Sequence, residues 1–147
     1  MGVGRAEHLP LVAGTLARLG ARAVVVHGAP GMDEASLCGP NRILTVDAGR
    51  VQESVLTPRD LGLDEVPPAA LAGLPPGESA AEVRRILAGA GGPRADQVAL
   101  NAAGALVAGG LASTWGAGLD KARAALANGH TDKVLASYLS FVGKGAV

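Results

Sequence analysis

The sequence predicts an α/β fold, with a partial sheet (one buried strand plus a β-hairpin) covered by an N-terminal helix and about four C-terminal helices. Three observations support this class. An amphipathic helical pattern precedes a run of β-branched residues, a hairpin pattern follows, and the second half of the chain shows helical periodicity alone. A chain of 147 residues can bury a sizeable core. We therefore expect residues 1–147 to form a single domain.

The first helix and strand are predicted by their apolar spacing. Residues 6–19 place apolar side chains at helical intervals, and Gly20 is a typical stop; these side chains belong to Leu9, Val12, Ala13, Leu16 and Leu19. The segment Ala23–His27 is apolar on both faces. That pattern is typical of a parallel strand in a sheet interior, with further strands on its flanks.

A hairpin and a proline-rich segment follow. Two β-prone segments, 42–47 and 51–56, flank the turn Asp47-Ala48-Gly49, in which glycine can adopt the positive φ that the turn requires. Residues 58–78 contain five prolines, Pro58, Pro67, Pro68, Pro75 and Pro76. We expect this segment to be an extended surface connection.

Four helices are expected after the connection. Ser79 and Glu82 match a capping box that opens a helix ending near Leu87. Pro93 can begin a second helix over 93–108, and a third should run from Ser113 or Thr114 to Asn128-Gly129. Thr131 is expected to cap a fourth helix, with a core stripe made by Val134, Leu135, Tyr138, Leu139 and Val142.

Composition excludes several classes of function. The formal net charge is +0 and no dense basic run occurs, so neither a nucleic-acid binder nor a binder of anionic membranes is indicated. Cys38 is the only cysteine, which excludes an internal disulfide and favours a reducing compartment. The N-terminus lacks an apolar signal core, and the apolar stretch 98–111 is too short to cross a bilayer. These features predict a soluble cytoplasmic protein.

The acidic pair Asp33-Glu34 is the main candidate for chemistry. It follows the predicted strand and a Gly-Ala-Pro-Gly turn, and ligands of open α/β sheets gather beyond the carboxyl ends of strands. Two carboxylates can hold Mg²⁺ in a partial shell that the phosphates of a substrate complete. The alternative is a solvated loop, or acids in the first turn of a helix at 33–37.

Other polar or reactive side chains give weaker indications of function. His27 ends the strand, where a hydrogen bond to nearby backbone is the simplest interpretation. Cys38 has no nearby base and is expected to be a small buried filler. His8 and His130 show no metal-ligand spacing, and Trp115 and Tyr138 are expected to be core or interface anchors. No catalytic residue is assigned.

Read in order, three segments resemble the C-terminal part of the anthranilate phosphoribosyltransferase family. They are AVVVHGAPGMDEAS, GPNRILTVDAGRVQESVLTPRDLGL and PRADQVALNAAGALVAGG. The most specific piece is H-G-x-x-G-x-D-E after a strand. The match covers nearly the whole chain but under half of the family's usual length.

This resemblance implies the large α/β domain that the family shares with pyrimidine nucleoside phosphorylases. It implies that Asp33 and Glu34 bind Mg²⁺, which bridges the pyrophosphate of phosphoribosyl pyrophosphate. The matching positions His27, Gly28 and Gly31 are the expected substrate-binding residues.

The chain also departs from the family. The family's glycine-rich GTGGD loop, its KHGNR-type segment and its acceptor-contacting residues have no equivalent here, and the family's Gly-Gly-Asp and Asn are replaced by Pro76-Gly77-Glu78 and Glu82. Three hypotheses follow. The protein is a truncated or split phosphoribosyltransferase that is inactive alone, a repurposed remnant acting as a small-molecule enzyme or binding protein, or a non-functional fragment. The expected partner is a second copy or a chain supplying the N-terminal half.

Overall fold

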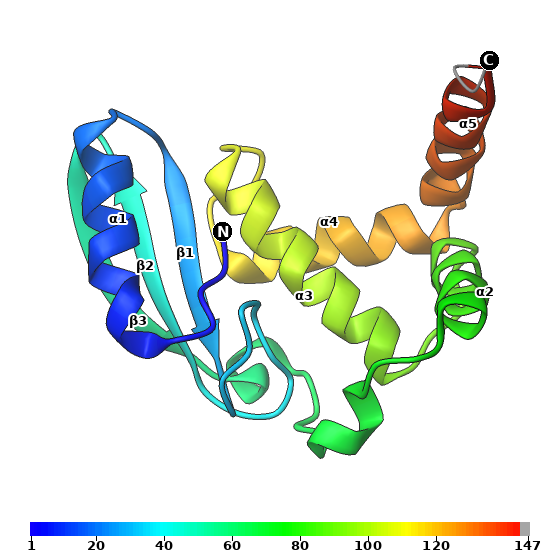
Figure 1. Ribbon diagram of the computed structural model, residues 1–147, viewed down its shortest axis with the longest axis horizontal. Coiled ribbons are helices and arrows are strands. Elements are labelled where there is room, and N and C mark those ends of the chain that lie inside the picture. The colour runs from blue at the N-terminus through cyan, green and yellow to red at the C-terminus, as the bar shows by residue number, and fades with distance from the viewer. Residues whose placement is uncertain (145–147) are drawn as a thin grey trace.

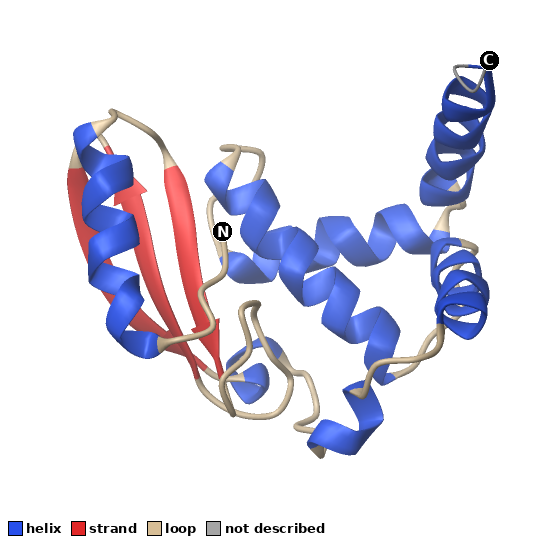
Figure 2. Cartoon of the chain, viewed as in Figure 1, coloured by secondary structure: helices blue, strands red, loops and turns tan. Residues whose placement is uncertain are grey.

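The computed structural model describes residues 1–144, so the last part of the expected single domain, 145–147, lies outside the described residues. Figures 1 and 2 show a small sheet with α1 on one face, and helices α2–α5 extending away from the other face. The strands are β1 (Ala23–Gly28), β2 (Asn41–Asp47) and β3 (Arg50–Leu56). The helices are α1 (Leu9–Arg18), α2 (Pro76–Leu87), α3 (Pro93–Ala108), α4 (Trp115–Ala127) and α5 (His130–Lys144). The expected α/β class is confirmed.

The predicted hairpin is present. The three strands lie in the order β1-β2-β3, and both pairs are antiparallel. Asp47 pairs with Arg50 across a two-residue turn in which Ala48 has φ 47° and Gly49 has φ 76°. Positive φ at both turn positions is the hairpin geometry that matches the right-handed twist of the strands. Gly49 therefore has the conformation expected from the sequence.

The expected parallel pairing of β1 is wrong, because its partner β2 is antiparallel. On its other side, residues 1–3 run parallel to β1. The Val26 N–H donates to the Met1 carbonyl (3.0 Å), and the Val3 N–H donates to the Val26 carbonyl (2.9 Å). The apolar character of β1 on both faces reflects the two layers that cover the sheet, and it carries no information on strand direction.

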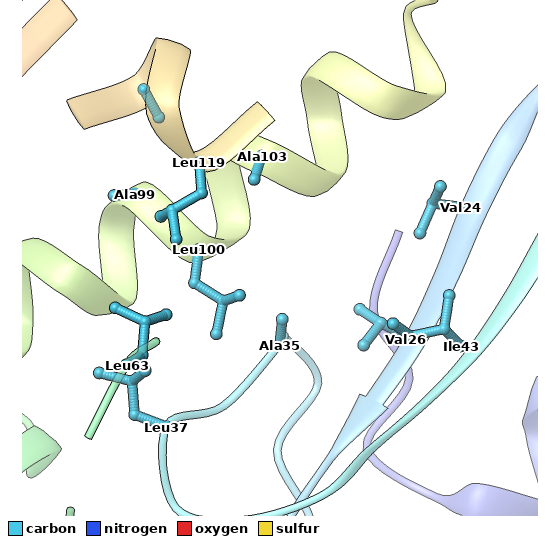
Figure 3. Packing of buried hydrophobic residues seen from close by; sticks show 11 residues of the cluster. Val24, Val26, Ala35, Leu37, Ile43, Leu63, Ala99, Leu100, Ala103 and Leu119 are labelled. Carbon is cyan, nitrogen blue, oxygen red and sulfur yellow. The ribbon is translucent and has the colours of Figure 1, made fainter. Parts of the chain in front are cut away.

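Two apolar clusters lie on opposite faces of the sheet. On one face α1 buries Leu9 and Ala13 against Val25, Leu44 and Val46. On the other face α3 and α4 bury apolar side chains against the sheet and the loop after β1 (Figure 3). This second cluster includes Val24, Val26, Ala35, Leu37, Ile43, Leu63, Leu100 and Leu119. It attaches the segment containing the acidic pair to α3.

The segment 58–78 is less extended than expected. It contains two 3₁₀ helices, Pro58–Leu61 and Pro68–Leu71, and the first turn of α2. The capping box at Ser79 is wrong, because the helix begins at Pro76 and the Ser79 N–H donates to the Pro75 carbonyl (2.8 Å). Proline is favoured in the first helical turn, and here it moves the start of the helix toward the N-terminus.

Helix α3 has the expected limits, and the Thr114 hydroxyl caps α4 by accepting from the Ala117 N–H (3.1 Å). The cap predicted at Thr131 is wrong, because Thr131 lies inside α5 and its hydroxyl donates to the Leu87 carbonyl (2.7 Å).

The core stripe expected on α5 is also wrong: Val134 and Tyr138 are each 61% exposed. Helix α5 contacts α2 and α4 near its start and projects from the body (Figure 1). Among the described residues, no helix has the length and apolar character needed to span a bilayer.

Candidate functional site: a carboxylate pair beside the end of β1

The acidic pair lies next to the strand that it follows. After β1, the Gly28 N–H donates to the Met32 carbonyl (3.0 Å) and the Met32 N–H donates to the Gly28 carbonyl (2.7 Å). These reciprocal bonds close a tight loop. Asp33 and Glu34 therefore return to the end of β1, and residues 33–37 form no helix. The alternative of acids in a helical first turn is excluded.

Asp33 and Glu34 both line one cavity of about 140 Å³. Asp33 is exposed and Glu34 is half-buried. The other walls come from the N-terminal residues, β1, α3 and the start of α4: Met1, Gly2, Val24, Val26, Asn101, Gly104, Ala105, Ala108 and Trp115. Among the described residues neither carboxylate forms a salt bridge. The pair is accessible and its negative charge is not neutralised by a basic side chain.

Two glycines allow the backbone of the acidic pair to come close. A Cβ added at Gly2 would overlap the Asp33 carbonyl, and one added at Gly28 would overlap the Glu34 carbonyl. At Gly28 the same atom would also meet Asn41 Oδ1 at 2.8 Å. Glycine is therefore required at both positions for close approach of backbone, whether or not a ligand is bound.

Side chains bind four consecutive backbone N–H groups directly after Glu34. The N–H groups of Ala35 and Leu37 donate to Asn101 Oδ1 (2.9 Å) and Gln97 Oε1 (3.0 Å), both on α3. The Ser36 N–H donates to Asn41 Oδ1 (2.6 Å), and the Cys38 N–H donates to Ser36 Oγ (2.9 Å). This segment has no strand or helix ladder, so three side-chain amides and one hydroxyl satisfy its N–H groups.

The sequence analysis missed Gln97, Asn101 and Asn41. A signal for the first two was present, because they lie four residues apart in a helix whose later turns are otherwise apolar, and they therefore share one face of that helix. Polar side chains on a buried face must find hydrogen-bond partners. Asn41 is fully buried, and its Nδ2 donates to the carbonyls of Ser36, Gly39 and Leu56. No local pattern indicated those contacts.

The other expected site residues are placed differently. His27 Nδ1 lies 2.8 Å from the Val3 carbonyl and donates to it, since a carbonyl can only accept. This is the backbone hydrogen bond considered as the alternative role. Gly31 is exposed, with φ 132° and open space around it. Substrate binding by His27, Gly28 and Gly31 stays a prediction. Cys38 is half-buried, and Trp115 packs its indole over Gly104.

Glu82, which replaces the asparagine of the resembled family, forms an ion pair with Arg85 and does not line the cavity of the acidic pair. Both of its carboxylate oxygens accept from Arg85, each at 2.8 Å. This two-bond pairing lowers the pKa of Glu82 from its ordinary value. Within the described residues no group of three or more potential metal ligands occurs. A cation held by Asp33 and Glu34 would therefore need water or a bound ligand to complete its shell.

Two carboxylates of this kind fit a hard cation such as Mg²⁺. Magnesium prefers oxygen ligands and is usually bound through one or two carboxylates, while substrate phosphates and waters occupy its other positions. Asp33, which is exposed, and Glu34, which is half-buried, form no salt bridge with the described basic side chains and satisfy that requirement.

Comparison with known proteins agrees with this geometry. The family model described as "Glycosyl transferase family, a/b domain" matches residues 1–132. Anthranilate phosphoribosyltransferase from Desulforamulus reducens is 37% identical over 142 residues, covering 96% of this chain and 41% of that protein. The enzyme from Pelotomaculum thermopropionicum is 43% identical over 134 residues, covering 90% of this chain and 39% of that protein. The chain thus spans well under half the length of the curated relatives it matches.

Solved structures show the same fold. The anthranilate phosphoribosyltransferase of Thermus thermophilus matches with a TM-score of 0.87 and 42% identity, over 95% of this chain and 41% of that one. The Saccharomyces cerevisiae enzyme in complex with PRPP and Mg matches with a TM-score of 0.87 and 25% identity, over 97% of this chain and 42% of that one. The family model covers most of the chain, and the fold agrees throughout the matched region. This chain therefore belongs to the glycosyl transferase family and carries its a/b domain.

Proposed function

We propose that this chain contributes the metal-diphosphate corner of a phosphoribosyl transfer site. Asp33 and Glu34 would hold Mg²⁺, and the diphosphate of phosphoribosyl pyrophosphate would complete the metal shell. The single observation that carries this proposal is the placement of two carboxylates, neither in a salt bridge with the described residues, in one cavity at the end of β1. The fold match to a yeast anthranilate phosphoribosyltransferase in complex with PRPP and Mg supports it.

The chain's own residues would bind and orient the ligand. The carboxylates accept no proton in this role; they supply negative oxygen atoms on one wall of the cavity. Val24, Val26 and Trp115 provide apolar parts of the cavity wall. When bound, Mg²⁺ neutralises charge that develops on the leaving pyrophosphate.

We propose further that these residues do not complete a transfer site alone. The sequence has no equivalent of the family's glycine-rich diphosphate loop or of its acceptor-contacting residues. Groups that position a substrate and stabilise developing charge each commonly contribute several kcal/mol to lowering a barrier. The missing groups would come from a polypeptide segment that carries the N-terminal part of the family. The proposed contact is the side of β1 opposite β2, where residues 1–3 are the described residues that pair with β1.

Thermal unfolding tests the metal-diphosphate role. Mg²⁺ with pyrophosphate is expected to raise the melting temperature, since a ligand at 100 times its Kd stabilises the folded state by about 2.7 kcal/mol. Asp33→Ala should abolish the rise. The chain offers a matched control in its other adjacent acidic pair, because Asp64 is exposed and Glu65 pairs with Arg59 at 3.7 Å. Asp64→Ala should preserve the rise. An unchanged melting curve of the wild type at millimolar ligand would contradict the proposal.

A further inference from the structure

Helix α3 holds the backbone that follows the acidic pair through two amide side chains. Gln97 Nε2 donates to the Ala35 carbonyl (2.6 Å), and Asn101 Nδ2 donates to the same atom (2.8 Å). In return, Asn101 Oδ1 accepts from the Ala35 N–H and Gln97 Oε1 accepts from the Leu37 N–H. Two residues one helical turn apart thus make four hydrogen bonds to a three-residue segment. We call Gln97 and Asn101 the amide clamp.

The clamp acts next to Glu34 and not at a distant point of the loop. Ala35 is completely buried, and its backbone is fixed at both polar atoms. Asn101 Nδ2 also donates to the Gln97 carbonyl (3.0 Å), so both hydrogens of that amide are used. The orientation of Asn101 is therefore determined by α3 itself. Because α3 also lines the cavity through Gly104 and Ala105, the clamp holds the backbone that follows Glu34 against the same helix that forms part of the cavity wall.

The other side of the pair is held by different contacts. Gly2 and Gly28 lie directly against the carbonyls of Asp33 and Glu34, as their lack of room for a Cβ shows. The backbone of the pair is thus confined between β1 with the N-terminal residues on one side and α3 on the other. A backbone confined in this way limits the positions that the two carboxylates can take before a cation binds. A lower ordering cost on binding is the physical benefit.

We propose that Gln97 and Asn101 are positioning residues for the metal-diphosphate corner. They act through the backbone of residues 35–37, which their four hydrogen bonds hold. This inference rests on the proposed function, since it concerns the affinity of the same carboxylate pair. Partners that orient metal ligands typically change metal affinity by about 10- to 100-fold when removed.

Calorimetric titration of the full chain with Mg²⁺ and pyrophosphate tests the clamp. Asn101→Leu and Gln97→Met keep the approximate volume of each side chain and remove its hydrogen bonds. Each variant is expected to bind Mg²⁺-pyrophosphate at least 10-fold more weakly than the wild type. Two variants are used because either one alone can fail to fold, which circular dichroism would reveal.

A stability control separates positioning from general destabilisation. Val46→Ala removes a fully buried side chain from the α1 face of the sheet, away from the cavity. It is expected to lower the melting temperature as the clamp variants do, but to keep the wild-type Kd. Wild-type affinity in both clamp variants, or an equal loss in Val46→Ala, would overturn the clamp while leaving the metal site in place. Absence of binding by the wild type would overturn the proposed function, and the clamp with it.

Discussion

Gly118 of α4 lies against the backbone of α3, so its replacement by alanine should separate the two helices. A Cβ at this position would lie 2.8 Å from the Ala103 carbonyl oxygen and 3.0 Å from Ala103 Cα. A steric overlap with backbone atoms can be relieved only by moving one of the helices. Overpacking of this kind costs about 1–3 kcal/mol. Alanine in a helix interior gains about 1 kcal/mol over glycine. The net expectation for Gly118→Ala is a loss of up to about 2 kcal/mol.

Gly116 provides a matched control in the same helix. A Cβ there would meet only Thr114 Oγ1, at 4.0 Å, so Gly116→Ala is expected to be neutral or slightly stabilising. The helix propensity largely cancels between the two variants, which leaves the overpacking cost of about 1–3 kcal/mol as their difference. Urea unfolding measures it. With an m-value of about 1–3 kcal/mol/M, the midpoints should differ by roughly 1 M. Equal midpoints, or a more stable Gly118→Ala, would refute close backbone packing of α3 and α4.

Three further expectations concern activity, assembly and acid stability. The purified chain alone should not transfer the phosphoribosyl group of phosphoribosyl pyrophosphate to anthranilate with release of pyrophosphate. Anthranilate consumption above that of an Asp33→Asn/Glu34→Gln double variant would contradict this. Sedimentation equilibrium at micromolar concentration should give the mass of a homodimer, with an interface on the order of 2,000 Å²; a single species at the monomer mass would exclude that dimer. The Thr57 backbone N–H and hydroxyl donate to Asp60 and lower its pKa from the ordinary 3.8. The stabilising contribution of the Asp60 carboxylate is therefore present above pH 3.8 and is lost as pH falls through the folded-state pKa. Asp60→Asn should lower the urea midpoint near neutral pH and change it less in strong acid. Equal shifts of the midpoint at both pH values would argue against this.

The sequence predicted those elements whose local signals agree with their surroundings. The hairpin turn at Gly49 and the limits of α3 and α4 depend on turn chemistry, on Pro93 in a first helical turn and on the Thr114 cap. The acidic pair was also found from its place after a strand. Each of these features is determined within a few residues of the chain.

The errors arose where tertiary contacts decide the outcome. Tyr138 and Val134 follow a helical stripe, but α5 projects away from the body and leaves them exposed. Thr131 bonds to Leu87 on α2, a contact that no local pattern encodes. The residues holding the acidic pair come from positions more than 60 apart in the chain, as in the bond from Ala35 to Asn101. Periodicity assigns a face to a helix but does not state what covers that face.

The location of the cation is the most direct test of the metal-diphosphate corner. Mn²⁺ takes the same oxygen ligands as Mg²⁺, and its unpaired electrons broaden the NMR signals of nearby amides. In the presence of pyrophosphate, substoichiometric Mn²⁺ should broaden first the amides around Asp33 and Glu34, including Gly2 and Ala35, which adjoin the pair. The amides of Asp64 and Glu65 should stay sharp at the same metal concentration. Broadening that begins at Asp64 and Glu65, or that spreads equally over all exposed carboxylates, would contradict the account.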